Sequence, residues 1–289
     1  MAQATMVLTV MVENAVTEFG LFENGELAAS WQTSTPEHLT ADEARMQLRS
    51  GLAAFAPQWG GGDMGFSVAA PSVVLGSVVP ALTDVWCEAL AAETGGRVLV
   101  MGPRLKTGMA IACKNPAEVG ADRVADALAA RELAGAPCIV VHLEAATAIT
   151  VVDAKGALAG GMIAPGFEAS VGTLSHVAAR LTEVEAGAPR QVVGKTTQEA
   201  IASGVFWGEV ARIDGLVAMA RAELAAEMAG GKGAGPVEPA SGESAAEAPE
   251  SIPVLITGKN AQQLAEHLAC HPRVHPALTL QGLALCARG

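Results

Sequence analysis

The sequence predicts a protein of the α/β class, and three observations support this prediction. Short runs rich in apolar and β-branched residues, such as 6–12 and 138–141, alternate with longer stretches of helical spacing, such as 81–93. The order strand, strand, strand, helix, strand, helix occurs in the first half of the chain and again in the second. Apolar residues make up 51 % of the 289 residues, which is ample for the core of one large domain or two lobes.

The first half begins with two predicted strands, at 6–12 and 17–22. Asn24-Gly25 follows them and is the strongest short turn signal of this region, because both residues tolerate the left-handed backbone of a tight hairpin. The turn leads into a third predicted strand at 27–31.

A helix is predicted next, and its start has a recognisable signal. Thr40 followed by Glu43 has the spacing of a capping box, and the helix that it opens is expected to reach about residue 55. The remaining predicted elements of this half are a strand at 66–70, a helix at 81–93, a strand at 97–101, a turn at 115–120 and a helix at 122–133.

The second half repeats the plan of the first. Its predicted strands are 138–141, 147–153, 157–162 and 252–257, and its predicted helices are 167–181, 198–228, 261–268 and 278–287. The stretch 230–251 consists almost entirely of Gly, Ala, Pro, Ser and Glu, and it has little to bury. We expect it to be a disordered insertion, because burial cannot offset the entropy of ordering it.

Charge and cysteine content limit the partners and the compartment. The net charge is −12 and the sequence pI is about 4.9, which argues against nucleic acid or an anionic membrane as a partner. Five widely spaced cysteines without a C-x-x-C pair indicate neither a zinc site nor a redox motif. No apolar run reaches the roughly 18 residues of a membrane span, and no signal peptide is recognised, so a cytoplasmic location is expected.

Three histidines near the end of the chain could suggest a metal site. His267, His271 and His275 are spaced by four, which would place neighbours on one face of a helix. Pro272 interrupts that helix, and only Glu266 adds a carboxylate nearby. We therefore expect no metal to be bound by this chain.

Five sequence blocks carry a resemblance to a known family. The chain is similar to the type III pantothenate kinases in the blocks N-P-A-E-V-G-A-D-R at 115–123, G-G-M-I-A-P-G at 160–166, V-G-K-T-T at 193–197, I-D-G-L at 213–216 and L-T-L-Q-G-L at 278–283. The resemblance covers nearly the whole chain outside 230–251. It implies two duplicated actin-like (ribonuclease-H-like) lobes, 1–135 and 136–289, each a mixed five-stranded sheet flanked by helices.

The resemblance also implies a substrate site. Asp122 matches the family's catalytic base, which takes a proton from the pantothenate hydroxyl. Gly120, Arg123 and Gly166 match substrate-binding positions, and in the family the arginine reaches the site from the opposite protomer. Spacing alone favours a simpler interpretation, in which Asp122 is a helix N-terminal aspartate that interacts with the macrodipole. The intact motif around it reverses this preference for substrate binding, but not for catalysis in this chain's own pocket.

Arg123 likewise has a simpler interpretation, as a surface residue paired with Glu118 or Asp126. Two further departures weaken the substrate side of the resemblance. The family's aromatic-aspartate pair before Asn115 reads Cys113-Lys114 here, and a threonine expected in a later helix aligns with Ala178.

The nucleotide side of the resemblance is altered much more. The family's first phosphate loop, Asp-x-Gly-Asn-Thr, aligns here with Met11, Val12, Glu13, Asn14 and Ala15. Its second loop, Asp-x-Gly-Thr-Ala-Thr, aligns with His142, Leu143, Glu144, Ala145, Ala146 and Thr147. A later T-G-G turn reads Thr257, Gly258 and Lys259. Both aspartates and both loop glycines are therefore absent, while Asn14, Thr147 and Gly258 remain.

These substitutions oppose nucleotide binding. Glycine lets phosphate oxygens approach backbone N–H groups, whereas a glutamate blocks that approach and adds a negative charge. Two unit charges about 4 Å apart repel by roughly 1 kcal/mol in water and about 4 kcal/mol at an effective dielectric constant near 20. We expect Glu13 and Glu144 to protrude where phosphates would lie. A new metal site of Glu13, Glu144 and His142 is the less favoured alternative.

The resulting hypothesis is a subunit of a heteromeric pantothenate kinase. The chain is expected to form a homodimer, or a heterodimer with an intact paralogue. In the heterodimer, the paralogue would bind ATP, Mg²⁺ and a monovalent cation, and this chain would complete the pantothenate site across the interface. Alone, the chain would be inactive. The alternatives are a non-catalytic pantothenate-binding or regulatory pseudokinase, and an active kinase with altered loops.

Overall fold

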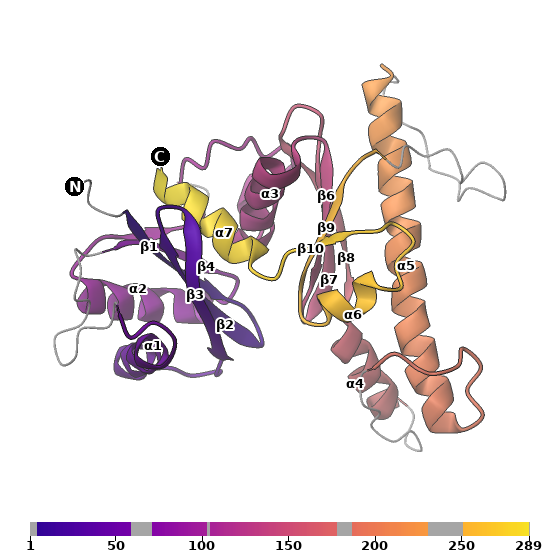
Figure 1. The fold of residues 1–289 in the computed structure, drawn as a ribbon, viewed down its shortest axis with the longest axis horizontal. Helices are drawn as coiled ribbons and strands as arrows, with labels where there is room; N and C mark the ends of the chain where they lie inside the picture. The colour runs from indigo at the N-terminus through magenta and orange to yellow at the C-terminus, as the bar shows by residue number, and fades with distance from the viewer. Residues whose placement is uncertain (1–4, 59–70, 103–104, 178–186, 231–250, 289) are drawn as a thin grey trace. The chain divides into compact units, whose positions relative to one another are not determined.

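The computed structural model describes residues 5–58, 71–102, 105–177, 187–230 and 251–288. The strand predicted at 66–70 lies outside these residues, as does nearly all of the predicted insertion at 230–251. The chain divides into two compact units, which are described separately: residues 1–129 with 277–289, and residues 130–276. Figure 1 traces both along the chain.

The first unit contains a five-stranded mixed sheet with the order β3-β2-β1-β4-β5. β2 pairs antiparallel with β1 and β3, whereas β4 and β5 continue the sheet in parallel on the other side. Each parallel step requires a crossover connection, which helices supply. The strands are β1 (Met6–Val12), β2 (Val16–Glu23), β3 (Glu26–Ser34), β4 (Ser72–Ser77) and β5 (Val98–Val100).

Alternate residues of β1 serve the two faces of this sheet. Val10 and Val12 pack with α1 (Ala41–Phe55) and α2 (Pro80–Thr94) in one core. On the other face, α7 (Leu278–Leu285) approaches Met11 through Gly76, because Leu283 lies close to the position of a Gly76 side chain. The last helix of the chain therefore completes the core of the first unit. Figure 1 shows α7 along this face and α1 and α2 on the other.

The second unit repeats the topology of the first. Its sheet has the order β10-β9-β6-β7-β8, in which β7 pairs antiparallel with β6 and β8, and β9 and β10 pair in parallel. Ile139, Val141, Phe206 and Ile213 belong to its buried core. The strands are β6 (Cys138–Leu143), β7 (Ala146–Val152), β8 (Leu158–Pro165), β9 (Val254–Gly258) and β10 (Arg273–Val274).

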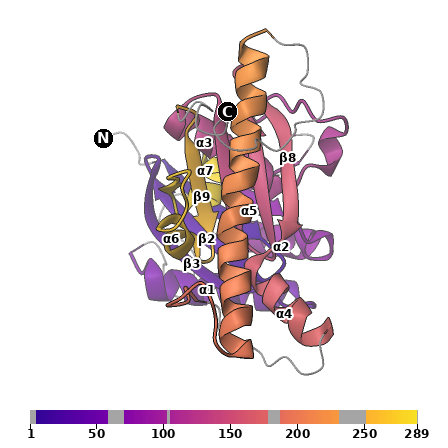
Figure 2. The same cartoon turned by 90° about the vertical axis from the view of Figure 1, so that its right-hand side faces the viewer.

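Helices α4 (Phe167–Val177), α5 (Thr197–Met228) and α6 (Ala261–Ala265) belong to this second unit. α5 begins at a capping box, in which the Thr196 side chain accepts from the Glu199 N–H and the Glu199 side chain accepts from the Thr196 N–H. Figure 2 shows α5 running along the second unit from end to end. No helix among the described residues is both long enough and apolar enough to cross a membrane.

The structure confirms the predicted α/β class and the two mixed five-stranded sheets, and several local signals hold as well. Thr40 and Glu43 form the predicted capping box, and Asn24 and Gly25 form the hairpin turn, with φ values of 53° and 90°. The boundary between the units differs from the predicted division at 135/136. It falls inside α3 (Ala121–Ala134), and α7 joins the first unit rather than the second.

Candidate functional site

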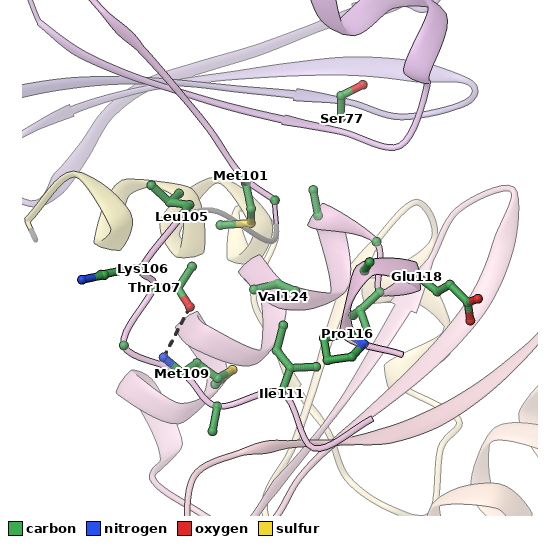
Figure 3. A pocket seen from close by; sticks show the side chains of 17 residues that line it. Ser77, Met101, Leu105, Lys106, Thr107, Met109, Ile111, Pro116, Glu118 and Val124 are labelled. Carbon is green, nitrogen blue, oxygen red and sulfur yellow. Dashed lines mark hydrogen bonds between the residues drawn. The ribbon is translucent and has the colours of Figure 1, made fainter. Parts of the chain in front are cut away.

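A pocket of about 800 Å³ lies in the first unit, between the segment that follows β5 and the start of α3. Figure 3 shows Met101, Leu105, Met109, Ile111 and Val124 as its apolar wall. The polar lining residues include Ser77, Lys106, Thr107 and Glu118. An apolar wall with a few polar groups suits a small, partly polar organic ligand.

Gly120 and Asp122 meet at the start of α3, and of these two only Gly120 is among the residues that line the pocket. Gly120 lines the pocket, and the Asp122 Oδ1 atom occupies the place where a side chain on residue 120 would point. Only glycine therefore leaves room for the carboxylate in this position. Asp122 is partly exposed and lies in the first turn of α3, where the helix dipole favours a negative charge.

The neighbouring polar residues hold the segment 115–123 in place. Asn115 donates through Nδ2 to Glu118 Oε1 over 2.7 Å, just before α3. Asp126 is buried and accepts from Thr279 Oγ1 over 2.7 Å, which ties α3 to α7. Arg123 is partly exposed. The two carboxylates considered as its ion-pair partners thus each accept a hydrogen bond from another residue.

The first altered loop is the turn between β1 and β2. Met11 is fully buried, and its sulfur lies 2.7 Å from the place of a Cβ on Gly76. Glu13 is only 4 % exposed, and its backbone N–H donates to Val16 O over 2.9 Å, which closes the turn. Asn14 lies exposed at the tip. A thioether packed into the core offers no oxygen for a magnesium ion, which prefers oxygen ligands.

The second altered loop is the turn between β6 and β7. Glu144 is partly exposed and turns back onto its own loop, since its Oε2 accepts from the Ala145 N–H over 3.0 Å. His142 is buried at the end of β6. Thr147 is buried and donates to Glu209 Oε1 on α5 over 2.6 Å. That Glu13 and Glu144 protrude where the phosphates of a nucleotide would lie stays a prediction.

Two glycines pack tightly against this second loop. A side chain on Gly166 would meet the carbonyl of Glu144, and one on Gly258 would meet the carbonyl of Leu143. Gly258 also has a φ of 89°, which favours glycine. The next residue, Lys259, donates its backbone N–H to Leu143 O over 2.8 Å and pairs with Glu168 through its side chain. The structure thus gathers His142, Glu144, Gly166 and Gly258 around one turn.

Sequence reasoning missed two parts of these sites. Residues 101–102 and 105–111, which supply most of one pocket wall, include Gly102, Gly108 and the pair Lys106-Thr107, a composition that could have marked a binding loop. Glu209 gave no local signal, because its partner Thr147 is 62 residues away in the sequence. Among the described residues, no group of three His, Cys, Asp or Glu side chains is arranged to hold a metal ion.

Two mixed five-stranded sheets of the same strand order, each with a turn after its first strand, define a duplicated α/β protein. The sequence model of the type III pantothenate kinases matches residues 7–219. The chain belongs to the type III pantothenate kinase family.

Individual relatives agree with this assignment. The chain is 34 % identical to a type III pantothenate kinase of Moorella thermoacetica over 280 residues, which cover 97 % of this chain and 98 % of the relative. It is 35 % identical to one of Streptomyces griseus over 281 residues, with 97 % of each chain covered. A crystal structure of a conserved putative Baf family transcriptional activator from Campylobacter jejuni is similar in fold, with a TM-score of 0.55, 16 % identity and 97 % of each chain covered.

Proposed function

We propose that this chain is a subunit of an assembly that phosphorylates pantothenate with ATP, the reaction that begins coenzyme A synthesis, and that its own nucleotide site is degenerate. The observation that carries the proposal is the buried side chain of Met11, at the position where the family has an aspartate. The relatives of this chain that are named type III pantothenate kinases support the proposal that it takes part in this reaction. The loop substitutions support the loss of nucleotide binding in this subunit.

The altered loops serve the fold of their own units. Met11 packs beside Gly76 and Leu283, and Glu144 caps its own turn, so neither side chain offers a site for a metal-bound triphosphate. Phosphoryl transfer depends on metal ions and fixed cations around the phosphates. An intact partner subunit would therefore hold ATP, Mg²⁺ and the monovalent cation, which this chain lacks the residues to bind.

The packing at the start of α3 supports the substrate side of the proposal. Gly120 leaves room for the Asp122 carboxylate beside a pocket of about 800 Å³, whose lining includes Lys106 and Thr107. Lys106 is a lining residue whose positive charge suits the carboxylate of pantothenate, and a carboxylate within reach of a hydroxyl can accept its proton. Arg123 would complete the partner's site in trans, as the family resemblance implies. Gly166 holds the second loop, and a contact with substrate at this residue is a further part of the proposal.

A second candidate function is a pantothenate-binding regulatory protein without catalysis. The pocket favours it, because every residue that lines it belongs to the first unit and lies outside both altered loops. Such a protein would bind pantothenate without ATP and without a partner. A third possibility, an active kinase with altered loops, requires the isolated chain to turn over.

The test is a coupled ADP-release assay on three samples: the chain alone, a paralogue with intact loops alone, and the two co-expressed and co-purified. We expect no turnover by the chain alone and more turnover by the pair than by the paralogue. Arg123→Met in this chain should remove that gain, whereas Arg97→Met, a change at an exposed arginine outside the pocket, should preserve it.

Other outcomes of these measurements would favour one of the two alternative functions. Turnover by the isolated chain would identify an active kinase. A pair without pantothenate phosphorylation would disprove the heteromer, and calorimetric binding of pantothenate by the chain alone would then favour the regulatory protein.

A further inference from the structure

Two guanidinium groups and an imidazole gather around a small pocket of the second unit. Arg221 comes from α5, His271 lies just before β10, and Arg273 is the first residue of β10. The pocket has a volume of about 290 Å³, and Ser251, Pro253 and Cys270 are also among its lining residues. This volume lies at the lower end of ligand pockets, so a small ligand suits it best. The gathering is notable in a chain whose net charge is −12.

Arg221 is fixed in this pocket by neutral groups. Its Nε and Nη2 atoms donate to Ile252 O over 3.1 and 2.9 Å, and Nη2 also lies 3.4 Å from Cys270 O. These carbonyls orient the guanidinium group but do not neutralise its charge. Because the guanidinium group is already ordered, binding of an anion to it would cost little further side-chain entropy.

The two arginines of this pocket differ from the arginines and the lysine that form ion pairs elsewhere in the structure. Arg45, Arg49, Arg212 and Lys259 each lie in an ion pair with a carboxylate. Within the described part of the chain, none of Arg221, His271 and Arg273 forms such a pair.

The acidic residue beside the pocket is already engaged by backbone donors. Asp214 accepts from the Ala269 N–H over 2.9 Å and from the Cys270 N–H over 3.0 Å, so it shapes the segment that carries His271. Its carboxylate is committed to these two amides and forms no ion pair with Arg221 or Arg273. The amides do not cancel the charge of Asp214, so the two guanidinium groups of the pocket, set against this one carboxylate, leave a net positive charge.

We propose that this pocket binds a small oxyanion, either inorganic phosphate or the phosphate of a small monoester. Guanidinium groups match the oxygen spacing of phosphate, and their hydrogen bonds to it are charge-assisted. Arg221 supplies a fixed charge at the wall, and the exposed Arg273 and His271 close on the ligand from the rim. The hydroxyl of Ser251 adds a neutral donor. The site lies in the second unit, whereas the proposed pantothenate pocket lies wholly in the first.

The experiment uses the full chain and inorganic phosphate as the probe. Isothermal titration calorimetry and ³¹P line broadening should show saturable binding at one site, and chloride at matched ionic strength should not compete. Arg273→Gln and His271→Gln should each weaken binding, the first by about tenfold, which corresponds to ~1.4 kcal/mol. Arg97→Gln, at an exposed arginine of the first unit, is the matched control and should bind as the wild type does. Glycerol 2-phosphate in place of phosphate distinguishes a monoester from the free ion.

Three results would overturn the proposal. Binding that does not saturate excludes a site, and equal weakening by Arg97→Gln shows that the ion responds only to net charge. The third result concerns the acidic stretch that precedes Ser251 in the sequence. Binding that appears only after Glu238, Glu243, Glu247 and Glu250 are replaced by Gln would make that stretch the occupant of the pocket.

Discussion

Met11, which aligns with the aspartate of the family's first phosphate loop, belongs to the buried core. In β1 its side chain points to the face that α7 covers, and its sulfur lies beside Gly76. The glycine leaves the space that the thioether fills. Residue identity at position 11 therefore affects stability, and a polar group there has no solvent to interact with.

Replacing Met11 with the aspartate of the family tests this interpretation. Met11→Asp should lower the free energy of unfolding by about 3 kcal/mol or more, because it buries a carboxylate without an established partner. Met11→Leu, which keeps the volume, should change it by less than about 1.5 kcal/mol. Urea unfolding followed by circular dichroism measures both. A stable Met11→Asp variant would show that the loop still accepts the family residue.

Residue identities predicted the local features well and the distant contacts poorly. Thr40 and Glu43 signalled their capping box because both partners lie within one turn of helix. Asn24-Gly25 signalled its turn for the same reason. By contrast, nothing near Met11 indicated on which face of β1 its side chain would pack, since that depends on α7 at the other end of the chain.

At the scale of the element, the turn between β6 and β7 is held by a polar network from α5. Glu209 accepts from Thr147 Oγ1 over 2.6 Å and also pairs with Arg212. Arg212 in turn donates to Pro165 O over 2.7 Å, at the end of β8. The network thus connects α5 to two strands of the same sheet, and the buried Glu209 is its centre.

Weakening this network should loosen the turn before it unfolds the unit. Glu209→Gln keeps an acceptor for Thr147 but removes the charge opposite Arg212, so we expect a loss of roughly 1–3 kcal/mol of stability. Hydrogen exchange should accelerate most at the amides of 144–147 and 166. Glu223→Gln, at an exposed position of the same helix, serves as the control. Equal exchange rates in the two variants would contradict the role assigned to Glu209.

The elements themselves were largely predictable, because each has a local pattern. Strands such as β1 and β6 are continuous apolar runs, and α5 begins and ends within a residue or two of its predicted bounds. β10 has only two residues and no pattern of its own, and it exists because β9 offers a free edge beside it. The pocket in the first unit was not predicted, since one of its walls comes from residues 101–102 and 105–111, most of which lie outside helices and strands.

At the scale of the whole molecule, three buried thiols link stability to alkaline pH. Burial raises the pKa of Cys138 and that of Cys270 to about 12, and the pKa of Cys286 to about 11, from a usual value of 9.0. The nearby Asp214 carboxylate adds to the rise for Cys270. In the unfolded chain these thiols lose their protons near pH 9, whereas in the folded chain they keep them.

The sign of the effect follows from this difference. The folded state holds more protons above pH 9, so the contribution of the thiols to stability is complete below that pH and is lost as the pH rises toward 11 or 12. Urea unfolding under reducing conditions should therefore give a lower free energy at pH 10.5 than at pH 7.5. A variant with all three cysteines replaced by Ala should show a smaller difference. An unchanged difference would assign the pH dependence to other groups.

The return of α7 to the first sheet affects how the protein is made. The ribosome synthesises residues 130–276 before α7. Until α7 has been made, it cannot cover the face of the first sheet that carries Met11, Gly20 and Gly76. At synthesis rates of about 5–20 residues per second, that delay is on the order of ten seconds. The second unit, continuous in sequence, can therefore finish folding first, and the nascent N-terminal half needs protection from aggregation until the last helix emerges.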